Sequence, residues 1–136
     1  MKGGEDMKQA LIIKVNSGTV EIIRTPFERG SLDFYYKELE CDCIDIVAAY
    51  GLTADADIIV DDEGLCKEKP VLNPYASIAY GWTSHGQPIV GNAIICKPHN
   101  TPDGVEETGF EEDELDKLLD EILRKFSEVY TLWLSQ

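Results

Sequence analysis

The chain has 136 residues, of which 43% are hydrophobic, and its 26 acidic and 12 basic side chains give a net charge of −14. This length favours one domain with a single core, and the ordinary apolar content excludes a chain that is disordered throughout. The negative charge disfavours direct binding of nucleic acid, and no apolar run approaches the ~20 residues needed to cross a bilayer, so we expect neither nucleic acid nor a membrane as a partner.

The N-terminal third of the chain predicts a β-hairpin and a short helix. Residues 10–15 and 20–24 are rich in Ile and Val and flank the turn sequence Asn-Ser-Gly-Thr, which predicts two paired strands. Ser31 is a suitable N-cap for a helix over residues 32–40. Its helical period places four side chains on one face: Leu32, Tyr35, Tyr36 and Leu39. Residues 1–7 show no such pattern and are expected to form a flexible tail.

The middle of the chain predicts two strands and a two-turn helix. Residues 43–50 and 58–60 are typical of strands, and the turn sequence Asp-Asp-Glu-Gly follows the second of them. Further along, Asn73 is a suitable N-cap, Pro74 suits the first helical position, and Gly81 suits the position after the last turn. These three residues together predict a helix between them.

Three segments follow this helix. Residues 82–87 are expected to form a loop. Residues 88–96 form the strongest strand pattern of the chain, in which Gly91 marks a bulge or a close approach of the backbone. Residues 99–107 are polar and are expected to form an acidic linker.

The clearest element is a C-terminal amphipathic helix over residues 108–136. Thr108 followed by Glu111 matches a capping box. Apolar residues then recur at helical spacing and define an apolar stripe: Leu115, Leu118, Leu119, Ile122, Leu123, Phe126, Val129, Tyr130 and Trp133. The predicted fold is therefore α+β, with a small mixed or antiparallel sheet and short helices in a core domain over residues 8–98, and the long C-terminal helix packed on it.

Three segments of the sequence together resemble one family. They are DDEG at residues 61–64, PVLNPYA at residues 70–76 and IVGNAIIC at residues 89–96. These segments are similar to motifs of the domain-of-unknown-function family thirty-eight forty-six, small proteins often carried by phages, plasmids and gut bacteria. The resemblance covers roughly residues 8–98 and leaves the C-terminal helix outside. It implies one small α+β fold and an origin in a mobile element, and it supplies neither an activity nor catalytic residues.

The sequence predicts no metal and no cofactor. The spacing of Cys41 and Cys43 is too short for a usual zinc pair, and neither Cys66 nor Cys96 has a partner nearby, so we expect four reduced and largely buried thiols in a cytoplasmic protein. The acidic stretch beginning at Asp55 lacks the central Gly and the final Glu of a calcium loop. The common catalytic motifs are absent, so we expect a protein that is not an enzyme.

One group of polar and aromatic residues suggests a ligand pocket. The group surrounds the two-turn helix and the start of the strongest strand: Asn73, Tyr75, Tyr80, Trp82, His85 and Asn92. Aromatic rings with a few amide and imidazole groups are typical of small-molecule or peptide pockets. The same side chains are equally typical of the edge of a small core, and the sequence leaves both interpretations open.

The charge distribution suggests a binding surface for a protein. Acidic residues gather around the first half of the C-terminal helix: Glu107, Glu111, Glu112, Asp113, Glu114, Asp116, Asp120 and Glu121. The main hypothesis is an inhibitor or accessory factor of a mobile element that presents this acidic face to a basic protein partner. The alternatives are a domain that sequesters a nucleotide-like small molecule and a surface that only keeps the protein soluble. A homodimer is also open.

Overall fold

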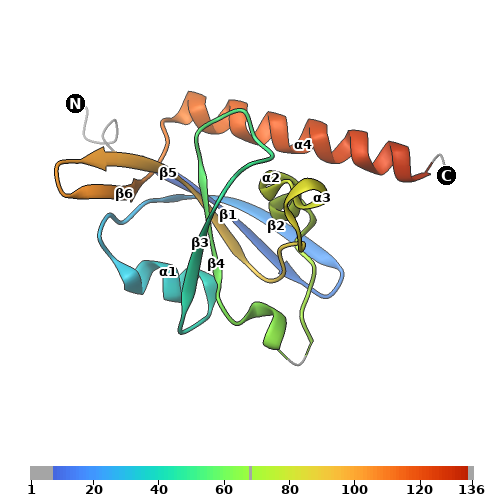
Figure 1. Cartoon of the computed structure of the whole chain (residues 1–136), viewed down its shortest axis with the longest axis horizontal. Helices are drawn as coiled ribbons and strands as arrows, with labels where there is room; N and C mark the ends of the chain where they lie inside the picture. Colours follow the sequence, from blue (N-terminus) through green and yellow to red (C-terminus); the bar gives the residue numbers. More distant parts are fainter. Residues whose placement is uncertain (1–7, 68, 135–136) are drawn as a thin grey trace.

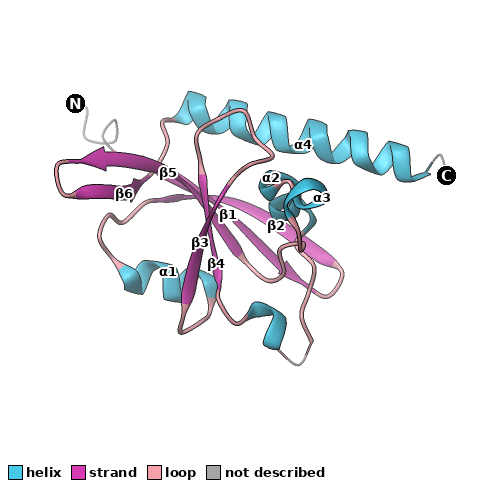
Figure 2. Ribbon diagram, in the orientation of Figure 1, coloured by secondary structure: helices cyan, strands magenta, loops and turns pink. Residues whose placement is uncertain are grey.

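The computed structural model describes residues 8–67 and 69–134 of the chain. Within these residues the fold is α+β, as predicted (Figures 1 and 2). The strands are β1 (Gln9–Asn16), β2 (Thr19–Pro26), β3 (Ile44–Ala48), β4 (Asp57–Asp61), β5 (Ala93–Thr101) and β6 (Gly104–Thr108). The helices are α1 (Leu32–Leu39), α2 (Pro74–Tyr80), α3 (Trp82–His85) and α4 (Glu112–Leu134), and η2 (Gly64–Cys66) is a 3-10 turn.

The strands form an antiparallel sheet in the order β2-β1-β5-β4-β3. The first half of β5 lies between β1 and β4 at the centre of this sheet. The second half of β5 continues beyond the centre and pairs with β6, which gives the hairpin that projects from the body of the molecule (Figure 2). The antiparallel alternative of the sequence prediction is thus confirmed within the described residues.

The two faces of the sheet are covered by different helices. Side chains of β1, β4 and β5 alternate between the faces, because successive residues of a strand point in opposite directions. On one face they pack against α2 and α4, and on the other against α1 (Figure 1). Ile58 and Ile59 illustrate the alternation, since the two neighbours are fully buried in different clusters. The central strands are therefore buried on both faces.

The predicted hairpin and the predicted N-cap of α1 are both present. Asn16 pairs with Thr19 at the β1–β2 turn, and Ser31 Oγ accepts a hydrogen bond from the Phe34 N–H at 3.1 Å. The predicted buried face of α1 is partly wrong. Phe34 is buried beside Tyr35 and Leu39, whereas Leu32 is 55% exposed, because the helix meets the sheet about one position away from the face that the apolar spacing suggests.

The two-turn helix is confirmed with its caps. Asn73 caps α2 through its side chain, Pro74 is the first helical residue, and Gly81 follows the last turn in the left-handed region at φ 75°. The segment after it differs from the prediction. It contains the single helical turn α3 in place of a continuous loop, and β5 begins only at Ala93. Gly91 precedes this strand at φ 78° and donates its N–H to the Val71 carbonyl, so the chain changes direction there.

The predicted acidic linker at residues 99–107 is wrong. These residues belong to the β5–β6 hairpin, in which Thr101 pairs with Gly104 around the Pro102–Asp103 turn. The Thr101 hydroxyl donates to the Gly104 carbonyl at 2.8 Å and accepts from the Asp103 N–H at 3.2 Å. Polar composition suggested a linker because both strands are largely exposed. The backbone ladder, which composition does not report, holds them together.

Helix α4 begins later than predicted. Thr108 ends β6, and the first helical residue is Glu112. The Glu114 carboxylate accepts from the Glu111 N–H at 2.9 Å, which is half of a capping box placed three residues beyond the predicted one. No helix in the described part of the chain is long and apolar enough to cross a membrane.

The apolar stripe of α4 is buried along its first half, as predicted, and exposed beyond it. Leu115, Leu118 and Ile122 are at most 1% exposed and pack on the sheet and α2. Further along, the exposed fraction reaches 43% at Val129 and 50% at Tyr130. The side chain of Trp133 lies outside the described part of the structure. The stripe therefore anchors the helix through its N-terminal half, while the C-terminal half extends past α2 (Figure 1).

Candidate functional site

The six residues predicted to form a ligand pocket do not share one cavity. Asn73 is fully buried and holds the fold together. Its Oδ1 accepts from the Ala76 N–H at 3.0 Å, and its Nδ2 donates to the carbonyls of Gly91 at 2.8 Å and Ile13 at 3.3 Å. Asn73 therefore ties the start of α2 to the sheet, which is a structural role.

The other predicted pocket residues are spread over the molecule. Tyr75 packs its ring against an aromatic ring of α4, with the centroids 4.7 Å apart. Asn92 accepts a hydrogen bond from a backbone N–H of β1 at 2.9 Å. Tyr80 and Trp82 line two different cavities, and the side chain of His85 lies outside the described part of the structure. Tyr80 is the one that borders the pocket described below.

Only part of the acidic set predicted as a partner face is exposed at the start of α4. Five of its carboxylates are exposed and define the α4 acidic face: Glu111, Glu112, Asp113, Asp116 and Asp120. Glu112, Asp116 and Asp120 follow one another at intervals of four residues, so they share one side of the helix, next to the buried stripe. Asp116 also pairs with Arg24 of β2 at 2.7 Å.

Two glutamates of the predicted face have structural roles instead. Glu121 is only 7% exposed, and its carboxylate accepts from the Thr53 N–H at 2.9 Å and from Lys125 Nζ at 3.0 Å. Glu114 pairs with Lys97 of β5 at 2.6 Å, in addition to capping α4. The helical period does not place either glutamate on the buried stripe, so the sequence gives no sign that they are bonded within the fold. Their bonds to the β3–β4 loop and to β5 are seen only in the packing of α4.

Glu107 departs from the predicted face altogether. It lies on β6, where its carboxylate accepts from the Cys96 thiol at 3.2 Å and shares a hydrogen bond with Asp57. Burial, together with the Asp57 carboxyl, raises the pKa of Glu107 to about 7. Burial also raises the pKa of the Cys96 thiol and of Tyr35, and the negative charge of Glu107 adds to both effects.

This cluster of Cys96, Glu107 and Asp57 lies where β4, β5 and β6 meet, and the sequence analysis did not predict it. The register of the strands brings the three side chains together across more than forty residues of chain. Among the residues that the structure describes, no group of three or more His, Cys, Asp or Glu side chains could hold a metal ion. Of the four thiols, which form no disulfide, Cys43 and Cys66 are exposed, which corrects the expectation of largely buried cysteines.

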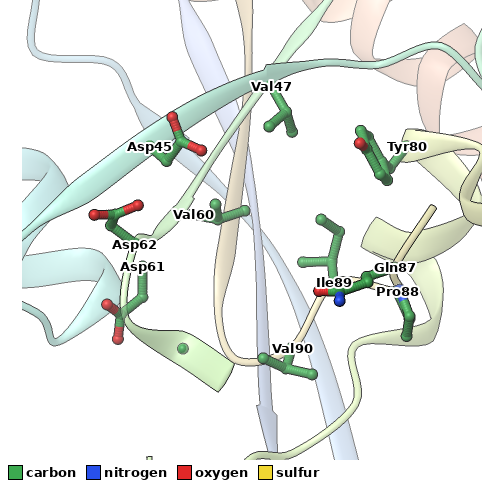
Figure 3. A pocket seen from close by; sticks show the side chains of 11 residues that line it. Asp45, Val47, Val60, Asp61, Asp62, Tyr80, Gln87, Pro88, Ile89 and Val90 are labelled. Atoms are coloured by element: carbon green, nitrogen blue, oxygen red, sulfur yellow. The ribbon is translucent and has the colours of Figure 1, made fainter. Parts of the chain in front are cut away.

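An open pocket of about 350 Å³ lies between β3, β4 and the segment that precedes β5 (Figure 3). Its apolar lining comes from Val47, Val60, Pro88, Ile89 and Val90, with Tyr80, Gln87 and Gly64 completing it. Its carboxylates are Asp45, Asp61 and Asp62, and no lysine or arginine is among the lining residues. Figure 3 shows the three aspartates on one side of the pocket and Tyr80 on the opposite side. We call this cavity the aspartate pocket.

Two of these aspartates are held by backbone hydrogen bonds. Asp45 Oδ1 accepts from the Ile46 N–H at 2.9 Å, and Asp61 Oδ1 accepts from the Glu63 N–H at 2.9 Å. Lys67 Nζ lies 3.4 Å from Asp61 Oδ2 at the rim, so one positive charge already faces this end of the pocket.

Sequence reasoning identified the Asp-Asp-Glu-Gly turn and missed the pocket beside it. The signal for Asp45 was in the alternation of the strand, which places Asp45 and Val47 on the same side. The contribution of residues 87–90 had no local signal, because those residues reach the pocket only through the bend at Gly91.

A second cavity, of about 550 Å³, lies beside the β1–β2 hairpin and is lined by charges of both signs. Lys14, Lys67 and Lys69 face it together with Glu21, Glu40 and Asp61. Lys14 lies 3.6 Å from Glu38 and Lys67 lies 3.4 Å from Asp61, so neighbouring carboxylates offset two of the lysines. Asn92 of the predicted pocket set borders this cavity.

Comparison with known proteins identifies one family. The family described as Domain of unknown function (DUF3846) matches residues 7–127. This match extends beyond the predicted range of residues 8–98 and includes the β5–β6 hairpin and most of α4, so the C-terminal helix is part of the family's domain. No curated protein and no solved structure matches the chain. The chain therefore belongs to the DUF3846 family of proteins of unknown function.

Proposed function

We propose that this chain is a non-enzymatic binding protein of the cytoplasm that uses its α4 acidic face to bind a protein with a basic surface. The observation that carries the proposal is the composition of residues 111–121, at the start of α4, where seven residues are acidic and one is basic. Two of the seven, Glu114 and Glu121, are used inside the fold, and the other five form the exposed face.

The geometry of α4 supports a functional role for this surface. Like charges four residues apart on a helix destabilise it by a few tenths of a kcal/mol. The repeat of Glu112, Asp116 and Asp120 therefore carries a cost, which the ion pair of Asp116 with Arg24 offsets at one position. The buried stripe fixes the helix to the sheet, and the carboxylates are thereby presented in a constant arrangement. A basic partner relieves their repulsion and is attracted from a distance, so its association slows as salt rises.

The mobile-element origin that the family resemblance implies suits an inhibitor or accessory factor, a role that needs a binding surface and no catalytic group. A nucleotide-like ligand is the second candidate, favoured by the three lysines of the larger cavity. The acids that share this cavity weaken that candidate, because they oppose a phosphate. A basic protein partner is therefore the better match to the surface.

The test compares two variants with the same change of charge. One neutralises the α4 acidic face by Glu112→Gln, Asp116→Asn and Asp120→Asn, and the control neutralises exposed residues elsewhere by Glu28→Gln, Asp42→Asn and Asp103→Asn. Tagged full-length proteins are used to capture partners from a host lysate at low and high salt. Captured proteins are identified by mass spectrometry, and each is then purified and titrated against all three chains.

We expect a basic protein that binds the wild type and the control equally, binds the α4 variant more weakly, and loses affinity as salt rises. Size-exclusion chromatography of the same samples shows whether the chain is a monomer or a homodimer. Equal affinity of all three chains for every captured protein, or affinity that salt does not change, would contradict the proposal.

A further inference from the structure

We propose that the aspartate pocket is a second, separate contact with the basic partner, and that it receives one lysine or arginine side chain of that protein. The inference rests on the proposed function, because the partner supplies the side chain. It assigns a site away from the α4 acidic face, in a cavity that β3, β4 and the segment before β5 enclose.

The size of the cavity suits one side chain. Ligand pockets of proteins start at about 300 Å³, and the aspartate pocket, at about 350 Å³, is at the small end of that range. Its three carboxylates repel a phosphate-bearing ligand, and it is open enough for a side chain to enter from outside. The cavity therefore has room for a single long side chain of a partner.

The distribution of polarity inside the cavity suits a basic side chain in particular. Lysine and arginine have an apolar stem that ends in a charged group, and they bury the stem along apolar surface while the charge stays at a polar site. The pocket offers Val60, Ile89 and Val90 for the stem and the aspartates for the charged end (Figure 3). These carboxylates repel an acidic occupant and attract a basic one.

The charges that line the pocket also favour a basic occupant. Asp45, Asp61 and Asp62 contribute three negative charges and the lining contributes no positive one. Lys67 offsets Asp61 from the rim, where its side chain is 53% exposed. Asp45 and Asp62 are therefore the carboxylates that attract an incoming ammonium or guanidinium group. The backbone N–H that holds Asp45 keeps its carboxylate in position for that group.

The experiment uses the full chain and small probes that each carry one side chain. The ¹H–¹⁵N NMR spectrum is recorded while N-acetyl-arginine amide or N-acetyl-lysine amide is added, and the neutral analogue N-acetyl-citrulline amide serves as the control for shape. The variant Asp45→Asn with Asp62→Asn removes charge from the pocket. The matched variant Asp116→Asn with Asp120→Asn removes the same charge from the α4 acidic face.

We expect saturable shifts at Val47, Val60 and Val90 with arginine, lysine or both, and none with citrulline. The affinity should fall roughly tenfold or more in the pocket variant and stay within about twofold in the α4 variant. Shifts that do not saturate, an equal response to citrulline, or equal losses in both variants would each overturn the inference. The probes need no partner protein, so this result is independent of the capture experiment. If the chain binds its partner through α4 alone, the α4 variant loses affinity in the capture experiment, while the arginine and lysine probes give no saturable shifts at the pocket.

Discussion

Glu121 of α4 accepts hydrogen bonds from both the backbone N–H (2.9 Å) and the hydroxyl (2.8 Å) of Thr53, which lies 68 residues earlier in the chain. Lys125, one turn further along the helix, donates to Glu121 and to the carbonyl of Gly51. The backbone N–H of Gly51 in turn donates to the Ala79 carbonyl at the end of α2. These bonds fasten the β3–β4 loop between α2 and α4, and through it they position β3 and β4, which form one wall of the aspartate pocket.

Replacing this carboxylate should destabilise the protein in a pH-dependent way. Burial raises the pKa of Glu121, but the hydrogen bonds from Thr53 and Lys125 outweigh burial, so the pKa lies below its usual value of 4.5. The charged carboxylate therefore stabilises the fold above that pH, and its contribution disappears as the pH falls through the lowered pKa. We expect Glu121→Gln to lower the free energy of unfolding by about 1–3 kcal/mol near neutral pH.

Urea unfolding followed by circular dichroism measures this loss, with Asp120→Asn as the control on the exposed side of the same helix. The difference between Glu121→Gln and the wild type should shrink at strongly acidic pH, while the control stays close to the wild type throughout. A Glu121→Gln protein as stable as the wild type at neutral pH would show that the bonds to Thr53 contribute nothing net.

Glu107 should give the opposite pH dependence. Its pKa is raised from 4.5 to about 7, so the folded state prefers the protonated carboxyl. The stability that this preference provides is complete below about pH 4.5 and is lost as the pH rises to about 7. We expect Glu107→Gln, which stays neutral, to be more stable than the wild type above pH 7 and to show a flatter dependence of stability on pH.

The measurement is the urea midpoint from about pH 5 to about pH 8, a range in which ordinary carboxylates are already ionised. Glu106→Gln is the matched control, because Glu106 is the exposed neighbour on β6. If the urea midpoint depends on pH equally in the wild type and in Glu107→Gln, Glu107 ionises without effect on the stability of the fold. The interpretation of its contacts with Asp57 and Cys96 would then be wrong.

The two halves of the apolar stripe should differ in their energetic importance. Leu118 is 1% exposed in the core, and removing its side chain leaves a cavity, so Leu118→Ala should cost about 2–5 kcal/mol. Leu123 is 41% exposed on the same helix, and Leu123→Ala should cost less than about 1 kcal/mol. Thermal unfolding of both variants gives the comparison. Similar costs at the two positions would indicate that the exposed half of the stripe is covered, for example by a second copy of the chain.

The cysteines should differ in reactivity. Cys43 and Cys66 are exposed, whereas Cys96 is buried and donates its thiol hydrogen to Glu107. Burial raises the pKa of the Cys41 thiol, and the negative charge of Asp61 raises it further. We therefore expect Cys41 to react more slowly than Cys43 and Cys66. Labelling of the native protein followed by mass spectrometry of its peptides should find Cys43 and Cys66 modified first and Cys96 only after unfolding. Early modification of Cys96 would show that β5 opens in the native state.

Some features of the fold were predictable because they depend on residues close together in the chain. The β1–β2 turn needs a residue that tolerates a positive φ, and Gly18 provides it at φ 90°. Ser31 and Asn73 cap helices by bonding N–H groups three residues ahead. The amphipathic pattern of α4 was readable because its period is that of the helix, and the same pattern showed where its acidic residues accumulate.

Other features depended on which surfaces meet, and local patterns carry no information about that. The contribution of Phe34 to the core follows from the side on which α1 approaches the sheet. Glu107 and Glu121 look like their exposed neighbours in the sequence, and only the strand register and the packing of α4 on the β3–β4 loop give them buried partners. The aspartate pocket likewise needs Asp45, Asp61 and Ile89 from three segments. Short-range hydrogen bonding and periodicity thus determine the elements, while the burial of charges and the enclosure of a cavity arise only when distant segments exclude water from one another.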